Sequence, residues 1–137
     1  MKNVSILFLS ALALSLGSCS SDDNSNPTHT DASIVGKWTY SKLGEGTNVV
    51  DYDDHEPGCD KDYIELTANG VFRDVDYDSF NAPCERFVDS GTYLKDGNTL
   101  TVTYDGEQID NANILLLTDT ELKIQGQDGD VIWFTRQ

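Results

Sequence analysis

The sequence is poor in the residues on which most enzyme chemistry depends. It has only 2 histidines, His29 and His55, and 3 cysteines among 137 residues. It contains no P-loop, dinucleotide-binding glycine pattern, serine-nucleophile motif or zinc-ligand spacing. The 24 acidic residues do not compensate, because an acid pair can be assembled by chance from so many carboxylates. We therefore expect a protein that is not an enzyme.

Basic charge is also scarce. Lysine and arginine total 9, and the formal net charge is −15 at pH 7. Recognition of a nucleic-acid backbone needs a clustered basic patch, and anionic membranes repel an acidic surface. Acidity otherwise reports mainly on solubility. We expect a monomeric domain that does not bind nucleic acid.

Long apolar runs are absent except near the N-terminus, where residues 1–18 have the pattern of an export signal. Lys2 precedes an apolar run from Val4 to Leu16, which is too short to span a bilayer. The following Leu16-Gly17-Ser18-Cys19 resembles the lipobox of bacterial lipoproteins. That resemblance implies that Cys19 becomes the acylated N-terminus and attaches the protein to a membrane, since two or more acyl chains anchor stably. The alternative is an ordinary secretory signal with an incidental Cys19.

Residues 19–33 form the next segment, the Cys19 site followed by a polar tether without large apolar side chains. A coil of this length has an r.m.s. span of about 20 Å. Its Ser20-Ser21-Asp22-Asp23 resembles an acidic signal that sends lipoproteins of some Gram-negative bacteria to the outer face of the outer membrane. The resemblance implies an outer-membrane lipoprotein exposed on the cell surface. The alternative is a plain acidic tether.

Two further cysteines, Cys59 and Cys84, follow the anchor. An exported protein enters an oxidising compartment, where an isolated pair is expected to form a disulfide. Closing a loop of this size stabilises a fold by roughly 3–4 kcal/mol in the chain-entropy model. A metal site is the alternative, although no Cys-x-x-Cys spacing occurs and His55 is the only histidine nearby.

Residues 34–137 form the folded domain, and no segment of it has a sustained helical period. Turn signals such as Asn69-Gly70 and Asp96-Gly97 recur between short alternating segments, which is typical of strands. We expect Ile114–Leu117, a continuous apolar run, to be buried on both faces. The expected strands are Ile34–Tyr40, Val49–Asp53, Asp62–Thr67, Val71–Tyr77, Phe87–Leu94, Thr99–Tyr104, Ile114–Leu117, Glu121–Gln125 and Val131–Arg136.

This pattern predicts an all-β fold, a small antiparallel up-and-down β-barrel of about eight strands. Short, evenly spaced strands favour a meander, and closing it removes the exposed edges. A β-sandwich is the alternative, because strand spacing alone does not separate the two. Eight strands leave an interior that holds side chains or one small ligand.

The ends of the domain resemble the calycins, a group that includes lipocalins and fatty-acid-binding proteins. Gly36-Lys37-Trp38 matches their Gly-x-Trp motif, and Arg136 matches their C-terminal arginine. The resemblance implies that Trp38 closes one end of the barrel and that Arg136 packs across its ring. Such a cation–π contact contributes about 0.5–2 kcal/mol.

More closely, residues 34–137 resemble the lipocalin-like domains of small Gram-negative lipoproteins. The shared elements, in order, are Val35-Gly36-Lys37-Trp38, Cys59, Tyr63, Leu66, Asn69-Gly70, Cys84, Gly91-Thr92-Tyr93, Gly97-Asn98 and Leu100. The resemblance implies a non-enzymatic envelope protein that binds a small apolar or amphipathic ligand. The alternative is an interaction or structural module with a filled barrel.

Three residues are candidate ligand contacts: Arg73, Tyr40 and Trp133. Arg73 shares a face with Val71 and Val75, and an inward arginine would need an acceptor such as a ligand's acid group. Alternatively, Phe72 marks the inward face and Arg73 pairs with surface acids. The aromatic side chains either line a pocket or fill the core.

Calcium is the one cofactor that the sequence suggests. Asp74, Asp76 and Asp78, with Glu85 eleven residues after Asp74, partly match a calcium-binding loop. Ser79 occupies the position of the invariant glycine, and the flanking segments are strands. A solvated acidic loop is the alternative.

Overall fold

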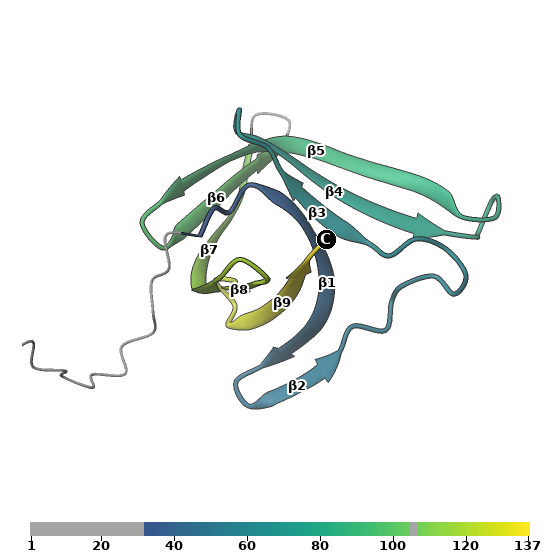
Figure 1. Cartoon of the computed structure of the whole chain (residues 1–137), viewed down its shortest axis with the longest axis horizontal. Helices are drawn as coiled ribbons and strands as arrows, with labels where there is room; N and C mark the ends of the chain where they lie inside the picture. The colour runs from purple at the N-terminus through teal and green to yellow at the C-terminus, as the bar shows by residue number, and fades with distance from the viewer. Residues whose placement is uncertain (1–31, 105–106) are drawn as a thin grey trace, which may run out of the picture.

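The computed structural model describes residues 32–104 and 107–137, where all regular secondary structure is β (Figure 1). The described residues contain no helix that is long and apolar enough to span a membrane. The strands are β1 (Gly36–Glu45), β2 (Asn48–Asp51), β3 (Tyr63–Leu66), β4 (Val71–Asp78), β5 (Glu85–Asp96), β6 (Thr99–Tyr104), β7 (Glu107–Leu117), β8 (Glu121–Gln125) and β9 (Asp130–Arg136).

The strands form a closed antiparallel barrel. Each strand from β3 to β8 pairs with the next in the chain, and β1 pairs with both β3 and β9. Strand β2 lies outside this ring of eight and pairs with the far end of β1. Figure 1 shows the ring, with the β4–β5 hairpin extending beyond it. The predicted up-and-down barrel is therefore confirmed, and the sandwich alternative is wrong.

Strand β1 continues past the end that the sequence predicts because it contains a β-bulge. Tyr40 pairs with Phe134 and Lys42 pairs with Trp133, so Ser41 is an extra residue on β1. A bulge bends a strand and re-aims its side chains. The Ser41 hydroxyl donates to the Trp133 carbonyl oxygen at 3.0 Å and ties the bulge to β9.

The core lies at one end of the barrel. The most deeply buried large side chains on the inner face are Trp38, Leu66, Leu100, Leu122 and Phe134. Burial of each contributes about 1.5–3 kcal/mol relative to exposure. At the opposite end of the barrel, inner-face positions are exposed and acidic, as at Glu45, Asp76 and Asp130. One end of the barrel is thus packed and the other is polar.

Strand β7 differs from the prediction for Ile114–Leu117. It begins earlier, at Glu107, and Leu115 is 40% exposed. A register shift between Ile114 and Leu116 interrupts its pairing with β8. The expected burial on both faces is therefore wrong, because only the inward side chains Ile114 and Leu117 are buried.

Candidate functional site

The packed end of the barrel is held by Trp38 and Arg136. The Trp38 side chain is fully buried, and its indole N–H donates to the Ile34 carbonyl oxygen at 2.8 Å. The Arg136 guanidinium carbon lies 4.0 Å from the centre of the Trp38 ring. The same guanidinium donates to the carbonyl oxygens of Asp119, Val35 and Ser33 at 2.7, 2.8 and 2.5 Å. One arginine of β9 therefore covers the indole and binds both the segment before β1 and the turn at Asp119.

Gly36 makes the close approach of Arg136 sterically feasible. A Cβ atom at Gly36 would collide with Nη1 of Arg136, and the φ angle of 149° lies where side chains are rarely found. A glycine is required where backbone and a side chain meet this closely. The structure thus places Gly36, Trp38 and Arg136 together at one end of the barrel.

A cavity of about 250 Å³ lies inside the barrel, next to this packed end. Its wall is mostly aliphatic and aromatic, with side chains from β1, β3, β4, β6, β7, β8 and β9. The lining residues are Tyr40, Ile64, Phe72, Asp74, Leu100, Val102, Tyr104, Ala112, Ile124, Ile132 and Phe134. An apolar cavity with a few polar groups is the usual form of a small-molecule site.

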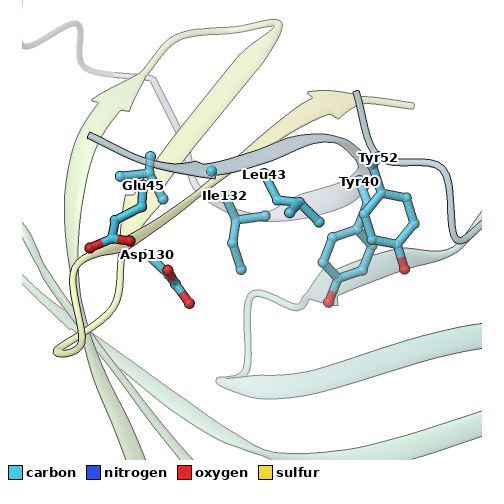
Figure 2. A pocket seen from close by; sticks show the side chains of 8 residues that line it. Tyr40, Leu43, Glu45, Tyr52, Asp130 and Ile132 are labelled. Atoms are coloured by element: carbon cyan, nitrogen blue, oxygen red, sulfur yellow. The ribbon is translucent and has the colours of Figure 1, made fainter. Parts of the chain in front are cut away.

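A second cavity, of about 270 Å³, adjoins the first and shares Tyr40 and Ile132 with it. Leu43 and Ile132 lie between the Tyr40–Tyr52 ring pair and the carboxylates of Glu45 and Asp130 (Figure 2). The Tyr40 and Tyr52 rings stack with their centres 4.9 Å apart. The two cavities together extend from an apolar interior to an acidic rim.

Asp74 is the one ionisable carboxylate in the wall of the first cavity. The Tyr40 hydroxyl donates to Asp74 Oδ1 at 2.9 Å. Burial raises the pKa of Asp74 to about 6, although the hydrogen bond from Tyr40 acts in the opposite direction. Burial, followed by the Asp74 charge, also raises the pKa of Tyr40, so its phenol is neutral at physiological pH.

Further acids surround Asp74. Asp89 lies directly across from it on β5, and Asp76 follows two residues later on β4. Burial and the charges of Asp62 and Asp89 raise the pKa of Asp76. Burial and the nearby aspartates also raise the pKa of Tyr104. Among the residues that the structure describes, no basic side chain lines either cavity.

Two of the predicted ligand contacts do not face the cavity. Arg73 lies on the outer face, where its Nη1 is 2.7 Å from Oε2 of Glu65 on the paired strand. Trp133 also lies outside, with Lys123 Nζ 4.1 Å from its ring centre. Both predictions are wrong for the same reason, because the neighbouring Phe72 and Phe134 occupy the inward positions of their strands. Tyr40, the third candidate, lines both cavities.

The predicted calcium loop is not formed. Asp74, Asp76 and Asp78 lie in β4, and Glu85 begins β5 opposite Asp78. Alternate residues of a strand are about 6.6 Å apart, so the three aspartates are spaced along a strand and are not gathered by a loop like that of a calcium-binding hand. Among the described residues, no group of three or more His, Cys, Asp and Glu side chains could hold a metal. The extended backbone of β4 therefore replaces the predicted loop.

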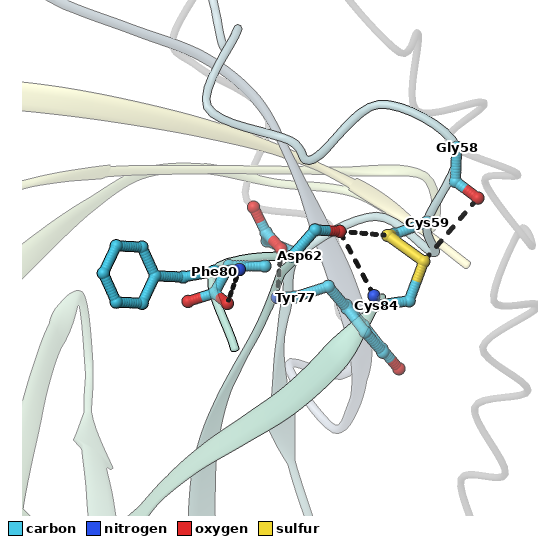
Figure 3. The surroundings of a disulfide bond; sticks show 8 residues. Gly58, Cys59, Asp62, Tyr77, Phe80 and Cys84 are labelled. Atoms are coloured by element: carbon cyan, nitrogen blue, oxygen red, sulfur yellow. Dashed lines mark hydrogen bonds between the residues drawn. A yellow bond between two sulfur atoms is a disulfide. The ribbon is translucent and has the colours of Figure 1, made fainter. Parts of the chain in front are cut away.

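The predicted disulfide is present. Cys59 and Cys84 are joined, with their Cα atoms 5.3 Å apart. The bond attaches the segment 52–62, which we call the strap, to the turn between β4 and β5 (Figure 3). Ser79 supports the turn, since its Oγ accepts from the Cys84 N–H at 3.2 Å.

The strap also contributes to the cavity wall. Strand β3 pairs with the first half of β1 and β2 pairs with the second half. The strap joins β2 to β3 across the gap between them, and it places Tyr52 against Tyr40. Asp62, only 2% exposed, accepts from the Tyr77 N–H at 2.9 Å. His55 Nε2 donates to the Tyr40 carbonyl oxygen at 3.0 Å, and His55 Nδ1 lies 3.2 Å from the Asp62 carboxylate. These bonds fix the strap, and with it the Tyr52 ring.

Most of the site is not predicted from the sequence. The sequence suggests Asp74 only as a calcium ligand, although its period-two spacing from Phe72 indicates that the two share the inward face. Leu43 and Glu45 follow the bulge on β1, which exchanges the inward and outward positions of the strand. No feature of the sequence indicates this bulge. Cys19, the predicted signal and the predicted tether up to residue 31 lie outside the described residues, so these predictions remain untested.

Comparison with known proteins gave a family and two similar solved structures. A family profile described as a lipocalin-like domain matches residues 34–124. A lipocalin-like protein from Bacteroides uniformis is 11% identical, with a TM-score of 0.59, covering 76% of this chain and 98% of that one. An uncharacterized protein from Bacteroides eggerthii is 13% identical, with a TM-score of 0.57, covering 75% and 98%. No curated protein matches the sequence. At these identities the structural likeness establishes the fold.

Proposed function

Because the chain belongs to the lipocalin-like domain family, we propose that it is a non-enzymatic, lipid-anchored envelope protein whose barrel binds a small apolar or amphipathic molecule. The observation that carries the proposal is the apolar cavity of about 250 Å³ inside the barrel. A module with a filled barrel would have side chains packed through this volume. The cavity therefore favours the ligand-binding function over the structural one.

A neutral fluorescent probe provides the test of ligand binding. N-phenyl-1-naphthylamine has no charge at neutral pH and fluoresces strongly in apolar surroundings. We expect saturable binding to the full chain, with displacement by components of a total bacterial lipid extract. Native mass spectrometry of the same mixture would identify the bound component.

Two variants on β7 make the test specific to the interior. Ala112→Phe fills the first cavity, since Ala112 is part of its wall. Leu115→Phe adds bulk to the same strand at a position 40% exposed. We expect the first variant to lose probe binding and the second to retain it. Equal binding by both variants would place the probe outside the barrel and contradict the proposal.

The lipid anchor is proposed from the sequence Leu16-Gly17-Ser18-Cys19 alone. We expect Cys19→Ser to abolish incorporation of an alkyne-labelled fatty acid in a Gram-negative host and to release the protein from the membrane fraction. Surface exposure, proposed from Ser20-Ser21-Asp22-Asp23, predicts digestion by protease added to intact cells. Unchanged labelling of Cys19→Ser would contradict the anchor.

A further inference from the structure

Asp74 is a carboxylate in a mostly apolar wall, and no cation of the described residues forms an ion pair with it. The ion pairs of the described residues are Arg73–Glu65 and His55–Asp62, and Asp74 belongs to neither. Its side-chain partner is the Tyr40 hydroxyl at 2.9 Å, a neutral donor. A buried carboxylate is costly unless it is paired. The cavity therefore contains a negative group that a ligand could complement.

The titratable groups near Asp74, on its own strand and on the strands around it, carry a negative charge or none. They are Tyr40 on β1, Asp76 on β4, Asp89 on β5 and Tyr104 on β6. The second cavity adds Glu45 and Asp130, which pair across β1 and β9. An entrance lined by one sign of charge concentrates ligands of the opposite sign and repels those of the same sign. Fatty-acid anions, with the same charge as the rim, fit this site poorly.

We propose that the ligand of this barrel is a cationic amphiphile, an organic ammonium whose apolar tail fills the cavity and whose charged head pairs with Asp74. The inference rests on the ligand-binding function proposed above and specifies its ligand class. Tyr40 then has a positioning role, because its hydroxyl donates to Oδ1 of the carboxylate with which the ammonium pairs. An ammonium–carboxylate hydrogen bond is among the stronger polar contacts available to a protein.

The pairing makes binding dependent on pH. The pKa of Asp74 is raised to about 6 in the unliganded barrel, so the carboxylate is ionised at pH 7.5 and protonated at pH 5. A cation binds only the ionised form well. Affinity for an ammonium should therefore fall as the pH decreases through about 6, while affinity for a neutral amphiphile should not.

Three octyl compounds that differ only in the head group test the proposal. Octylamine (protonated at pH 7.5), octanol and octanoate compete against N-phenyl-1-naphthylamine on the full chain. Charge-assisted hydrogen bonds correspond to about a tenfold or larger gain in affinity. We expect octylammonium to bind at least about tenfold more tightly than octanol, and octanoate to bind most weakly.

Asp74→Asn and Asp96→Asn remove the same charge from different places. Asp96 is exposed at the end of β5 and lines neither cavity. We expect Asp74→Asn to eliminate the preference for octylammonium and Asp96→Asn to preserve it. The pH profile of the unaltered chain gives a second readout that needs no variant.

Each other outcome overturns a defined part of the proposal. Equal affinity for octylammonium and octanol would overturn the cationic class while leaving the ligand-binding function in place. If the preference for octylammonium survives in Asp74→Asn, or persists unchanged at pH 5, it arises from the overall acidity of the chain. Either result would overturn the role of Asp74. Failure of the neutral probe and all three competitors to bind would overturn the proposed function itself.

Discussion

At the residue scale, Asp74 is in an environment that opposes its charge. Burial raises its pKa from 3.8 to about 6, so the folded barrel binds a proton more tightly than the unfolded chain does. Between those two values the folded state holds more protons, and stability falls as the pH rises. Above about pH 6 the full free-energy cost of burying the charged carboxylate is present, and below about pH 4 this cost vanishes. Asp74 thus destabilises the unliganded barrel at neutral pH.

Asp74→Asn should therefore stabilise the unliganded protein. We expect the free energy of unfolding at pH 7.5 to rise by about 1–2 kcal/mol, after discounting for solvent near the cavity entrance. The gain should disappear near pH 4, where the native carboxyl is also neutral. Urea titrations at several pH values measure this, with Asp96→Asn as the charge-matched control. A gain that is independent of pH would contradict the assignment.

Arg136 is the second residue with a large expected effect. It covers the Trp38 ring and donates to three carbonyl oxygens, two in the segment before β1 and one at Asp119. We expect Arg136→Ala to lower the free energy of unfolding by about 2–4 kcal/mol, since it removes a cation–π contact and charge-assisted hydrogen bonds. Denaturant unfolding followed by tryptophan fluorescence measures the loss.

A conservative variant separates the two contributions of Arg136. Arg136→Lys keeps the charge over the indole but cannot reproduce the planar fork of donors. It should recover less than half of the loss. Full recovery of the free energy of unfolding in Arg136→Lys would show that charge alone accounts for the contact. An unchanged free energy of unfolding in Arg136→Ala would contradict the role of Arg136 in closing the barrel.

At the element scale, the strap connects β2 to β3, and the disulfide attaches it to the turn between β4 and β5. The disulfide closes a loop with a sequence separation of 25 residues. We expect the double variant Cys59→Ser, Cys84→Ser to be less stable by about 2–4 kcal/mol, because the unfolded chain gains conformational entropy. Thermal unfolding measures this, and reduction of the native protein should match it. A midpoint insensitive to both would contradict the prediction.

The buried Asp62 is the other fixed point of the strap. Its carboxylate accepts from the Tyr77 N–H and lies near His55 and Tyr52. Asp62→Ala should cost about 2–4 kcal/mol, because it leaves buried donors without an acceptor. Binding of N-phenyl-1-naphthylamine should weaken in the same variant, since Tyr52 lines the second cavity. Normal binding would show that the strap does not position that ring.

The strands were predictable to different degrees. Thr99–Tyr104 and Glu121–Gln125 have the predicted bounds because strict alternation and turn residues mark both ends. The pairing of the first and last strands followed from the resemblance carried by Trp38 and Arg136. The bulge at Ser41 and the early start of β7 arise from tertiary pairing, which local alternation does not encode. For that reason the residues beyond the bulge were missing from the predicted site.

At the scale of the whole molecule, charge is the dominant feature. A net charge of −15 on a chain of this size repels itself in the compact state. We expect the thermal unfolding midpoint to rise by a few degrees as sodium chloride increases from about 0.01 to 0.5 M, because the Debye length falls from about 30 Å to a few ångströms. Differential scanning fluorimetry measures the rise. A midpoint that falls with salt would show that favourable ion pairs outweigh the repulsion.

The contact between Arg136 and Ser33 also shows at which end of the barrel the chain enters the domain. Ser33 lies just before the domain, so the chain enters at the packed end, opposite the acidic rim of Glu45 and Asp130. Under the proposed anchoring at Cys19, the attachment point and the entrance would then lie at opposite poles. A ligand would reach the cavity from the aqueous side rather than from the bilayer. The protein would accordingly sample molecules dissolved outside the membrane, not those extracted from it.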